Sequence, residues 1–296
     1  ELVRGDCLGT VAASLPSLVE QAEDAGMQTG IVSTTRITHA TPAATYAHIA
    51  ERAWEADAYV PENHRMVCKD IALQLAEFSH GDGIDIILGG GRAMFLPNTT
   101  PDPEDVDKFG VRTDGRHLIN EWVAGRIDRQ FVWNKAQFDL AKPVGQLLGL
   151  FDFSDMEWEI DREFDAAGEP SLASMTETAI RHVEGSKNGF FLVVEAGRID
   201  HGHHVSNAYR ALMDTIALSN AVQVALDITN SKNTLIVVTA DHSHTLTISG
   251  YPARGNPILG YVADAEGVRQ VDEEGSPYTT LSYANGPGFR LSENAP

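Results

Sequence analysis

The chain has 296 residues, 43% of them hydrophobic, so it is long enough to bury a sizeable core and to form one large α/β domain. Its 42 acidic and 22 basic residues give a net charge of −20, which argues against nucleic acid as a partner. No stretch approaches the roughly 18 apolar residues of a membrane span, and Glu1 to Asp6 do not have the pattern of a signal peptide. We therefore expect a folded protein without a membrane-spanning helix.

Segments with helical and strand-like spacing alternate along the chain. The expected helices are 18–25, 71–78, 172–183 and 212–217, and the expected strands are Thr29–Ser33, Ile84–Leu88, Phe190–Val194 and Leu235–Val238. This alternation predicts a largely parallel sheet covered by helices.

Glycine, proline and threonine mark the ends of several segments. Thr41 and Pro42 are typical of a helix N-cap followed by proline in the first helical position. The glycines at 89–91 lack the Gly-Lys-Ser/Thr ending of a phosphate loop, so we expect a tight turn there. Residues 99–114 read as a surface loop, and from Gly250 onward the helical periodicity fades.

Two polar runs, 195–204 and 239–244, each follow a strand-like stretch and together contain five of the 11 histidines. A third polar run, which includes His39, follows the strand that ends at Ser33. Ligands of open α/β sheets collect beyond the carboxyl ends of the strands. Imidazole and carboxylate groups suit zinc, and magnesium prefers oxygen. A single Asp-His pair after a strand is usually a solvated turn, but two such runs favour a metal site.

Cys7 and Cys68 have two readings from the sequence, either buried free thiols or a disulfide. Asn98 begins a glycosylation sequon within the expected loop.

The chain closely resembles the alkaline phosphatases, in particular the animal-type branch. The segments that carry this resemblance are 32–43, 87–92, 100–104, 195–204, 207–212, 239–244 and 250–254. The resemblance implies a three-layer α/β/α sandwich with a large, mostly parallel central sheet, incomplete at both termini. It also implies that residues 1–249 form part of the catalytic core and that residues 250–296 begin a crown-like surface domain.

The resemblance assigns two zinc sites. Asp200 and His204 match ligands of the first zinc, and Asp241 and His242 match ligands of the second. If the first pair is helical, its four-residue spacing puts both side chains on one face.

The resemblance also assigns a magnesium site and a phosphate contact. Glu195 and Thr41 match the magnesium ligands, and His39 matches a histidine that acts near this ion through water. Arg52 matches the arginine whose two-pronged guanidinium binds the substrate phosphate. Three further histidines are interpreted as groups that support the ligands or the fold: His201, His203 and His244.

Calcium is a further candidate cofactor. Its site would comprise Glu104, the Phe151 carbonyl, Asp152 and Glu169. The carboxylate lengths of the last two are exchanged relative to the family, so the affinity is expected to differ.

The implied activity is hydrolysis of phosphate monoesters at alkaline pH through a phosphoserine intermediate. The family's nucleophile lies in an Asp-Ser-Ala-x-x-Ala-Thr-Ala run that residues 1–296 do not contain, and a bridging aspartate and a last zinc histidine are also missing. We therefore interpret the chain as the central part of an alkaline phosphatase. Two alternatives are a non-catalytic metal-binding fragment or module, and a related phosphodiesterase or sulfatase, although Arg52 with the magnesium set favours monoesters.

The resemblance also predicts where the protein is located, how it is modified and what it binds. It predicts a disulfide between Cys7 and Cys68, and thus an extracellular or cell-surface location. It also predicts a glycoprotein and a homodimer, bound to a membrane only through a lipid anchor outside this chain. The expected partners are phosphate monoesters and inorganic phosphate.

Overall fold

The structure is a computed structural model that describes residues 3–286. Within these residues, five parallel strands form the central sheet in the order β3-β4-β2-β1-β5. The strands are β1 (Gln28–Arg36), β2 (Ile86–Gly90), β3 (Arg129–Val132), β4 (Gln146–Leu150) and β5 (Phe190–Glu195). Because all five run in one direction, their carboxyl ends meet at one edge of the sheet.

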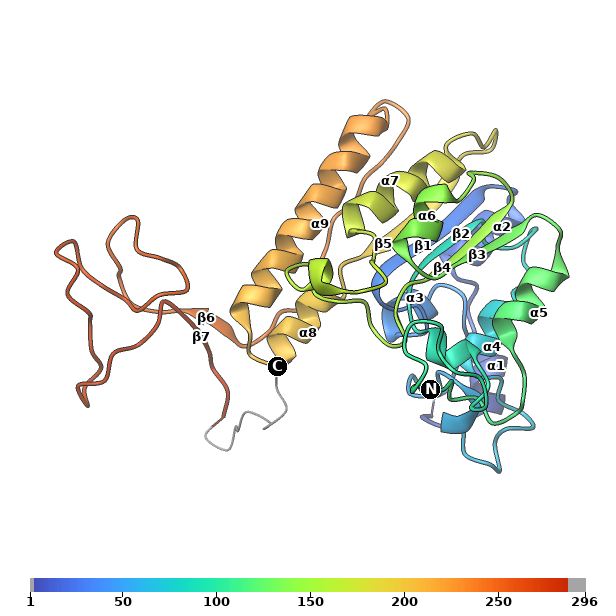
Figure 1. Ribbon diagram of the computed structural model, residues 1–296, viewed down its shortest axis with the longest axis horizontal. Coiled ribbons are helices and arrows are strands. Elements are labelled where there is room, and N and C mark those ends of the chain that lie inside the picture. Colours follow the sequence, from blue (N-terminus) through green and yellow to red (C-terminus); the bar gives the residue numbers. More distant parts are fainter. Residues whose placement is uncertain (1–2, 287–296) are drawn as a thin grey trace.

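Helices cover both faces of the sheet (Figure 1). Neighbouring strand residues face opposite sides, so Ile31 packs into one core and Val32 into the other. The first core lies under α2 (Leu18–Asp24), α3 (Ala40–Ala43), α4 (Ile71–Ala76) and α5 (Leu118–Gly125). The second lies under α6 (Lys135–Leu140), α7 (Leu172–Val183) and α9 (Ala208–Ile228). The predicted α/β/α sandwich with a parallel sheet is thus confirmed.

Two helices lie outside these layers. Helix α1 (Cys7–Ala13) begins at the N-cap Asp6, whose side chain accepts a hydrogen bond from the Gly9 N–H. Helix α8 (Arg198–His204) follows β5 and packs against α9. Three short 3-10 turns complete the helical segments: η1 (Asp57–Tyr59), η2 (Arg92–Phe95) and η3 (Arg162–Phe164).

The predicted strand Leu235–Val238 is wrong. Residues 234–240 form no regular secondary structure, and the side chains of Leu235, Val237 and Val238 are 87%, 74% and 60% exposed. The sheet ends at β5, so this apolar run has neither a partner strand nor a buried surface to stabilise pairing. Hydrophobicity alone therefore misidentified it.

The predicted helix N-cap at Thr41 is also wrong. Helix α3 begins two residues earlier than predicted, at Ala40, and the extended His39 is its N-cap. Pro42 consequently takes the third helical position. It fits there because the first-turn N–H groups have no partner within the helix in any case.

Helix α9 corrects the expectation that no segment is long and apolar enough to cross a membrane. Its best window has a mean hydropathy of 1.2, so by length and composition it meets the criterion. The helix packs against α7 and α8, and Asp214 and Ala221 are buried in it. We therefore describe α9 as a covering helix of the sheet.

The last described part of the chain has little regular structure. Strands β6 (Leu246–Ile248) and β7 (Leu281–Tyr283) pair antiparallel. Between them, residues 249–280 form a long loop that extends away from the α/β layers (Figure 1). The loss of helical periodicity after Gly250 agrees with this arrangement.

Candidate functional site

Helix α8 carries the first candidate metal ligands directly beyond the carboxyl end of β5. A Cβ at Gly197 would lie 2.3 Å from the Thr35 side chain, so glycine lets the chain turn this close to β1. Asp200 and His204 are one helical turn apart, and His204 Nε2 lies 3.3 Å from Asp200 Oδ2. The four-residue spacing therefore puts both side chains on one face, as predicted.

Two histidines from the segment after α9 approach the same carboxylate. His244 Nε2 is 2.5 Å and His242 Nε2 is 3.7 Å from Asp200 Oδ1. Ligand atoms of these three residues all lie within 4.8 Å of one another, and residues 3–286 contain no other group of three or more such ligands that meets this criterion. Imidazole nitrogens and a carboxylate at this spacing form a candidate site for a divalent ion such as zinc.

Asp241 and His203 border this group. Asp241 is largely exposed, and its Oδ2 lies 3.5 Å from His242 Nε2. His203 stacks on His244 with ring centroids 5.0 Å apart, and its Nδ1 is 2.8 Å from the Tyr283 hydroxyl. Tyr283 fixes the His203 ring, and the stacked His203 ring helps to orient His244. The sequence contains no signal for Tyr283, because the contact joins α8 to the distant strand β7.

The charge of Asp200 is stabilised by its neighbours. Burial raises the pKa of its carboxyl, but the hydrogen bond from His244 and the electrostatic effect of the surrounding histidines outweigh it. The pKa of Asp200 is therefore below its usual value. An ionised carboxylate among imidazoles is the state in which a metal ion binds.

Glu195, at the end of β5, meets polar residues of β1. Its Oε2 accepts hydrogen bonds from the hydroxyl groups of Ser33, at 2.5 Å, and Thr35, at 3.2 Å. The sequence analysis did not single out these two residues, although both follow the apolar part of an expected strand. Thr41 is exposed on α3.

His39 joins this edge of the sheet to Arg52. Arg52 Nη2 lies 3.2 Å from His39 Nε2, and the rings of His39 and His201 meet edge to face at 5.4 Å. The His39 Nδ1 atom is buried without a hydrogen-bond partner. Burial lowers the pKa of both histidines, that of His201 to about 4, so both are neutral at neutral pH. Arg52 is exposed beside His39, and Arg198 Nη1 lies 3.0 Å from His201 Nδ1 on the other side of the ring pair.

A buried ion-pair network that the sequence analysis missed supports these residues. Arg36 binds both Glu55 oxygens at 2.8 Å, and its Nη1 binds Asp155 Oδ2 at 2.7 Å. Asp155 Oδ2 also lies 3.8 Å from His201 Nδ1. The network thereby links the end of β1 to α8. Its partners are far apart in the sequence, so no local pattern reveals it.

The proposed calcium ligands lie around a second buried arginine, Arg92. Arg92 Nη2 binds Glu104 Oε2 at 2.7 Å, and Asp152 follows β4 directly. Glu169 is 2% exposed, its Oε2 accepts the Glu157 N–H at 2.9 Å, and its Oε1 has no partner. Burial is the main cause that raises the pKa of Asp152 to about 6 and that of Glu169 to about 9. For Asp152, burial thus outweighs the opposing effect of the Arg92 charge.

The predicted disulfide is present. It joins Cys7 of α1 to Cys68, with the two Cα atoms 5.6 Å apart. The pair is buried with Trp54 and Val60 in a small core of its own. The bond fixes the first helix to the segment that precedes α4.

The comparisons with known proteins agree on one family. The model of the alkaline phosphatase family matches residues 8–295. The membrane-bound alkaline phosphatase of Bombyx mori is 42% identical over 98% of this chain and 53% of its own length. The tissue-nonspecific isozyme of Gallus gallus is 42% identical over 98% and 56%, and the alkaline phosphatase of Gadus morhua is 40% identical over 99% and 61%.

Solved structures agree with this result. A cold-active alkaline phosphatase from Shewanella sp. aligns over 81% of this chain and 50% of its own, with a TM-score of 0.59 and 27% identity. The Thermus thermophilus enzyme aligns over 78% and 41%, with a TM-score of 0.59 and 30% identity. An α/β/α sandwich with a candidate metal site at the carboxyl ends of its strands defines the class. The chain belongs to the alkaline phosphatase family, and it spans about half the length of the curated relatives it matches.

Proposed function

We propose that the protein takes part in metal-dependent hydrolysis of phosphate monoesters at alkaline pH. The observation that carries this proposal is the Asp200, His242 and His244 group in a chain of the alkaline phosphatase family. This group adjoins His201, which contacts His39 and, through it, Arg52. Metal ligands beside an exposed cation suit a phosphate dianion, because metal ions and a guanidinium neutralise its charge together.

The first zinc site we propose uses one oxygen of Asp200, because His244 binds the other. Asp200 Oδ1 is bound by His244, and Asp200 Oδ2 is directed toward His204. Asp200 and His204 would hold the first zinc. Asp241 and His242 would hold the second. The unsaturated protein ligand sets fit catalytic rather than structural zinc. When bound, zinc supplies Lewis-acid stabilisation of the charge that develops on the phosphoryl oxygens.

The magnesium site we propose uses Glu195 and Thr41. Both offer oxygen, the ligand that magnesium prefers. Ser33 and Thr35 hold the Glu195 carboxylate in place, which favours a fixed ligand position. The neutral His39 beside Arg52 has one nitrogen that donates a hydrogen bond to water and one that accepts, and it adds no charge to the site.

The calcium site we propose comprises Glu104, the Phe151 carbonyl, Asp152 and Glu169. Its support is the buried, unpartnered Glu169 Oε1 and the raised pKa of this carboxyl. Calcium accepts six to eight oxygen ligands in flexible geometry, so it tolerates the exchanged lengths of Asp152 and Glu169.

The setting we propose is extracellular or at the cell surface, because the disulfide is typical of oxidising compartments. We also propose a homodimer, a glycan at the exposed Asn98 and, for membrane attachment, a lipid anchor beyond this chain. The division into a core (1–249) and a crown-like domain (250–296) is supported by the long loop between β6 and β7.

The test uses the complete gene product with added zinc and magnesium. We expect Asp200→Asn to lower bound zinc, measured by elemental analysis, and to reduce hydrolysis of p-nitrophenyl phosphate at least about tenfold. His80→Gln, a histidine away from the site, is the matched control and should change neither. Zinc retention with no turnover in the unmodified protein would instead support a non-catalytic metal-binding role.

Arg52 provides a second test of the same proposal. Arg52→Ala should weaken transition-state stabilisation by about 1.5–3 kcal/mol, the usual range for a hydrogen bond to a charged group. Arg52→Lys should recover only part, because an ammonium group does not bind in the two-pronged way. Unchanged inhibition by inorganic phosphate in Arg52→Ala would remove Arg52 from the site.

A further inference from the structure

An acid, Glu51, directly precedes Arg52 in the chain. Arg52 is exposed, and among residues 3–286 its guanidinium has one hydrogen bond, at 3.2 Å to His39 Nε2. Its other N–H donors are therefore open to an anion. A carboxylate presents two oxygens that fit a guanidinium in the same two-pronged way as a phosphate. Glu51 is thus a competitor, one residue away, for the group that the proposed function assigns to phosphate.

Arg4 binds both oxygens of Glu51. Its Nε donates to Glu51 Oε2, and its Nη2 donates to Glu51 Oε1 at 2.8 Å, which makes a two-pronged pair. Oε1 also accepts the Ala53 N–H at 3.2 Å. The hydrogen bond from Arg4 is the largest cause that lowers the pKa of Glu51, so this carboxyl is ionised at neutral and alkaline pH. Glu51 therefore carries a full charge that is bound to Arg4 and not to Arg52.

A backbone contact holds Arg4 in place beside this loop. The Gly5 N–H donates to the carbonyl oxygen of Ala50 at 3.1 Å, so the residues that follow Arg4 and precede Glu51 are joined directly. Gly5 has a φ of 83°, in the left-handed region that favours glycine. The ion pair is therefore more than a chance meeting of two long side chains, because the backbone brings its two ends together.

The disulfide supplies a covalent anchor for the same arrangement. Cys7 and Cys68 share a small core with Trp54, and Ile49 packs against this core. Ile49 and Trp54 lie on either side of Arg52 in the chain. One core thus carries both the N-terminal segment and the loop that presents Arg52.

We propose that Arg4 is a positioning residue of the phosphate site: it keeps Glu51 away from Arg52 and so leaves the Arg52 guanidinium free for a phosphate dianion. The inference rests on the proposed role of Arg52 and adds to it the residue that controls its availability. Without Arg4, the ionised Glu51 is expected to pair with Arg52. A phosphate would then have to displace a carboxylate, so its binding would weaken although none of its own contacts is removed.

The test measures binding of inorganic phosphate to the complete protein, loaded with zinc and magnesium, by calorimetry. Arg4→Gln should weaken phosphate binding about two- to fivefold, the effect of one surface ion pair. Bound zinc, measured by elemental analysis, should not change. Arg116→Gln is the matched control, because Arg116 forms the same kind of surface pair with Glu121. It should bind phosphate like the unmodified protein.

A double variant separates competition from a structural role. Arg4→Gln combined with Glu51→Gln should regain the phosphate affinity of the unmodified protein, because a neutral amide does not compete for Arg52. Arg4→Gln combined with Glu62→Gln has the same net charge but changes an exposed acid elsewhere, and it should stay weak. If the two double variants bind phosphate equally, the competition by Glu51 is disproved.

The outcomes distinguish this inference from the proposed function. If Arg52→Ala binds phosphate as tightly as the unmodified protein, the role of Arg52 itself is wrong. If Arg52→Ala weakens binding and Arg4→Gln does not, Arg52 keeps its role and only the inference about Arg4 fails.

Discussion

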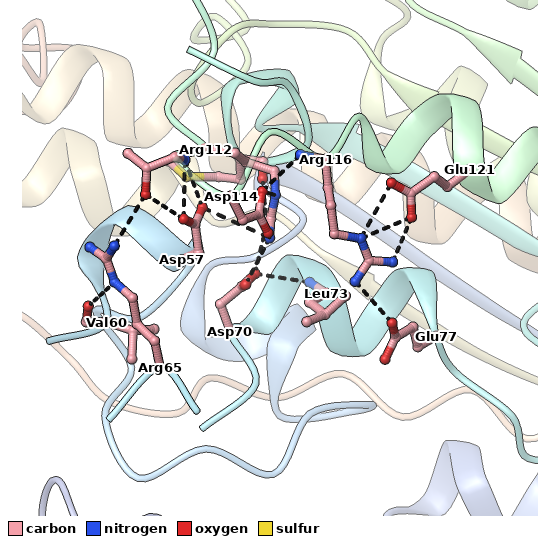
Figure 2. A network of polar contacts seen from close by, with 12 residues as sticks. Asp57, Val60, Arg65, Asp70, Leu73, Glu77, Arg112, Asp114, Arg116 and Glu121 are labelled. Carbon is pink, nitrogen blue, oxygen red and sulfur yellow. Dashed lines mark hydrogen bonds and ion pairs between the residues drawn. The ribbon is translucent and has the colours of Figure 1, made fainter. Parts of the chain in front are cut away.

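Arg92 and Arg112 are both completely buried, yet their surroundings differ. Around Arg112, every acid has its hydrogen-bonding groups satisfied, as Figure 2 shows. Asp70 binds Arg112 and caps α4 through the Leu73 N–H at 2.9 Å, and Asp114 binds Arg112 and accepts the Arg116 N–H at 3.0 Å. Arg92 binds Asp102 and Glu104, whereas Glu169, one of the acids of the proposed calcium site, keeps a buried oxygen without a partner.

The difference identifies which region needs a ligand. A cavity of about 190 Å³ adjoins Arg112, lined in part by Asp57, Asp70 and Arg65. It is flanked by charges that already have partners, so nothing in its polar groups calls for an ion. The calcium site proposed around Arg92 instead includes the unpartnered Glu169 oxygen. Satisfied networks stabilise a fold by themselves, whereas a partly satisfied network is stable only with a further component.

The largest effect is expected at Arg112. Arg112→Met should lower the free energy of unfolding by about 3–5 kcal/mol, because it leaves the buried Asp70 charge without its partner. Urea unfolding followed by circular dichroism measures this change. Arg116→Ala is the matched control: this arginine pairs with Glu77 and Glu121 at the surface, where a pair contributes at most about 1 kcal/mol. Equal losses in both variants would show that the Arg112 network has no special role.

The second-largest expected effect is a pH dependence of the stability that arises from Glu169, whose pKa burial raises to about 9. The folded state binds more protons than the unfolded state between about pH 4.5 and 9, so stability without calcium falls as the pH rises through this window. At pH 9.5, Glu169→Gln should therefore be more stable than the unmodified protein by about 3 kcal/mol without calcium.

Calcium should reverse this order. The ion stabilises the ionised Glu169, so the unmodified protein gains stability on calcium addition and Glu169→Gln gains less. Urea unfolding at pH 9.5 with calcium chloride or with a chelator measures both states. A variant that keeps the same advantage in both media would mean that no cation binds at this carboxylate.

The two regions also show what the sequence reveals. The shared face of Asp200 and His204 on α8 was predictable from their four-residue spacing, whereas their proposed role as zinc ligands came from the resemblance to the family. Strands such as Phe190–Glu195 were predictable from their continuous apolar runs. The strands β3 and β4 were missed because they are short and interrupted, β3 by its polar start at Arg129 and Gln130 and β4 by Gln146 and Gly149. Contacts such as Arg112 with Asp70 join residues 42 positions apart, and only the fold determines such pairs.

The smallest expected effect concerns Glu23, which is intermediate between the two regions. Thr29 donates a hydrogen bond to its Oε1, and its Oε2 is buried without a partner. Burial raises the pKa of Glu23 to about 7, and the charges of Asp82 and Asp85 act in the same direction. With no cation site proposed here, the carboxyl is expected to remain protonated at acidic pH.

The raised pKa of Glu23 determines how stability changes with pH. The folded state holds a proton on Glu23 that the unfolded state releases above about pH 4.5, so stability is fully present below that pH and falls until about pH 7. The expected loss is about 2 kcal/mol, and Glu23→Gln should remove it. Urea unfolding at pH 4.5 and 7.5 measures the difference, with the exposed Glu62→Gln as control. Calcium should not restore the stability lost at Glu23, in contrast to Glu169. If it does, an unpartnered buried oxygen with one nearby donor is enough for cation binding, and the distinction drawn between protonation and ligation fails.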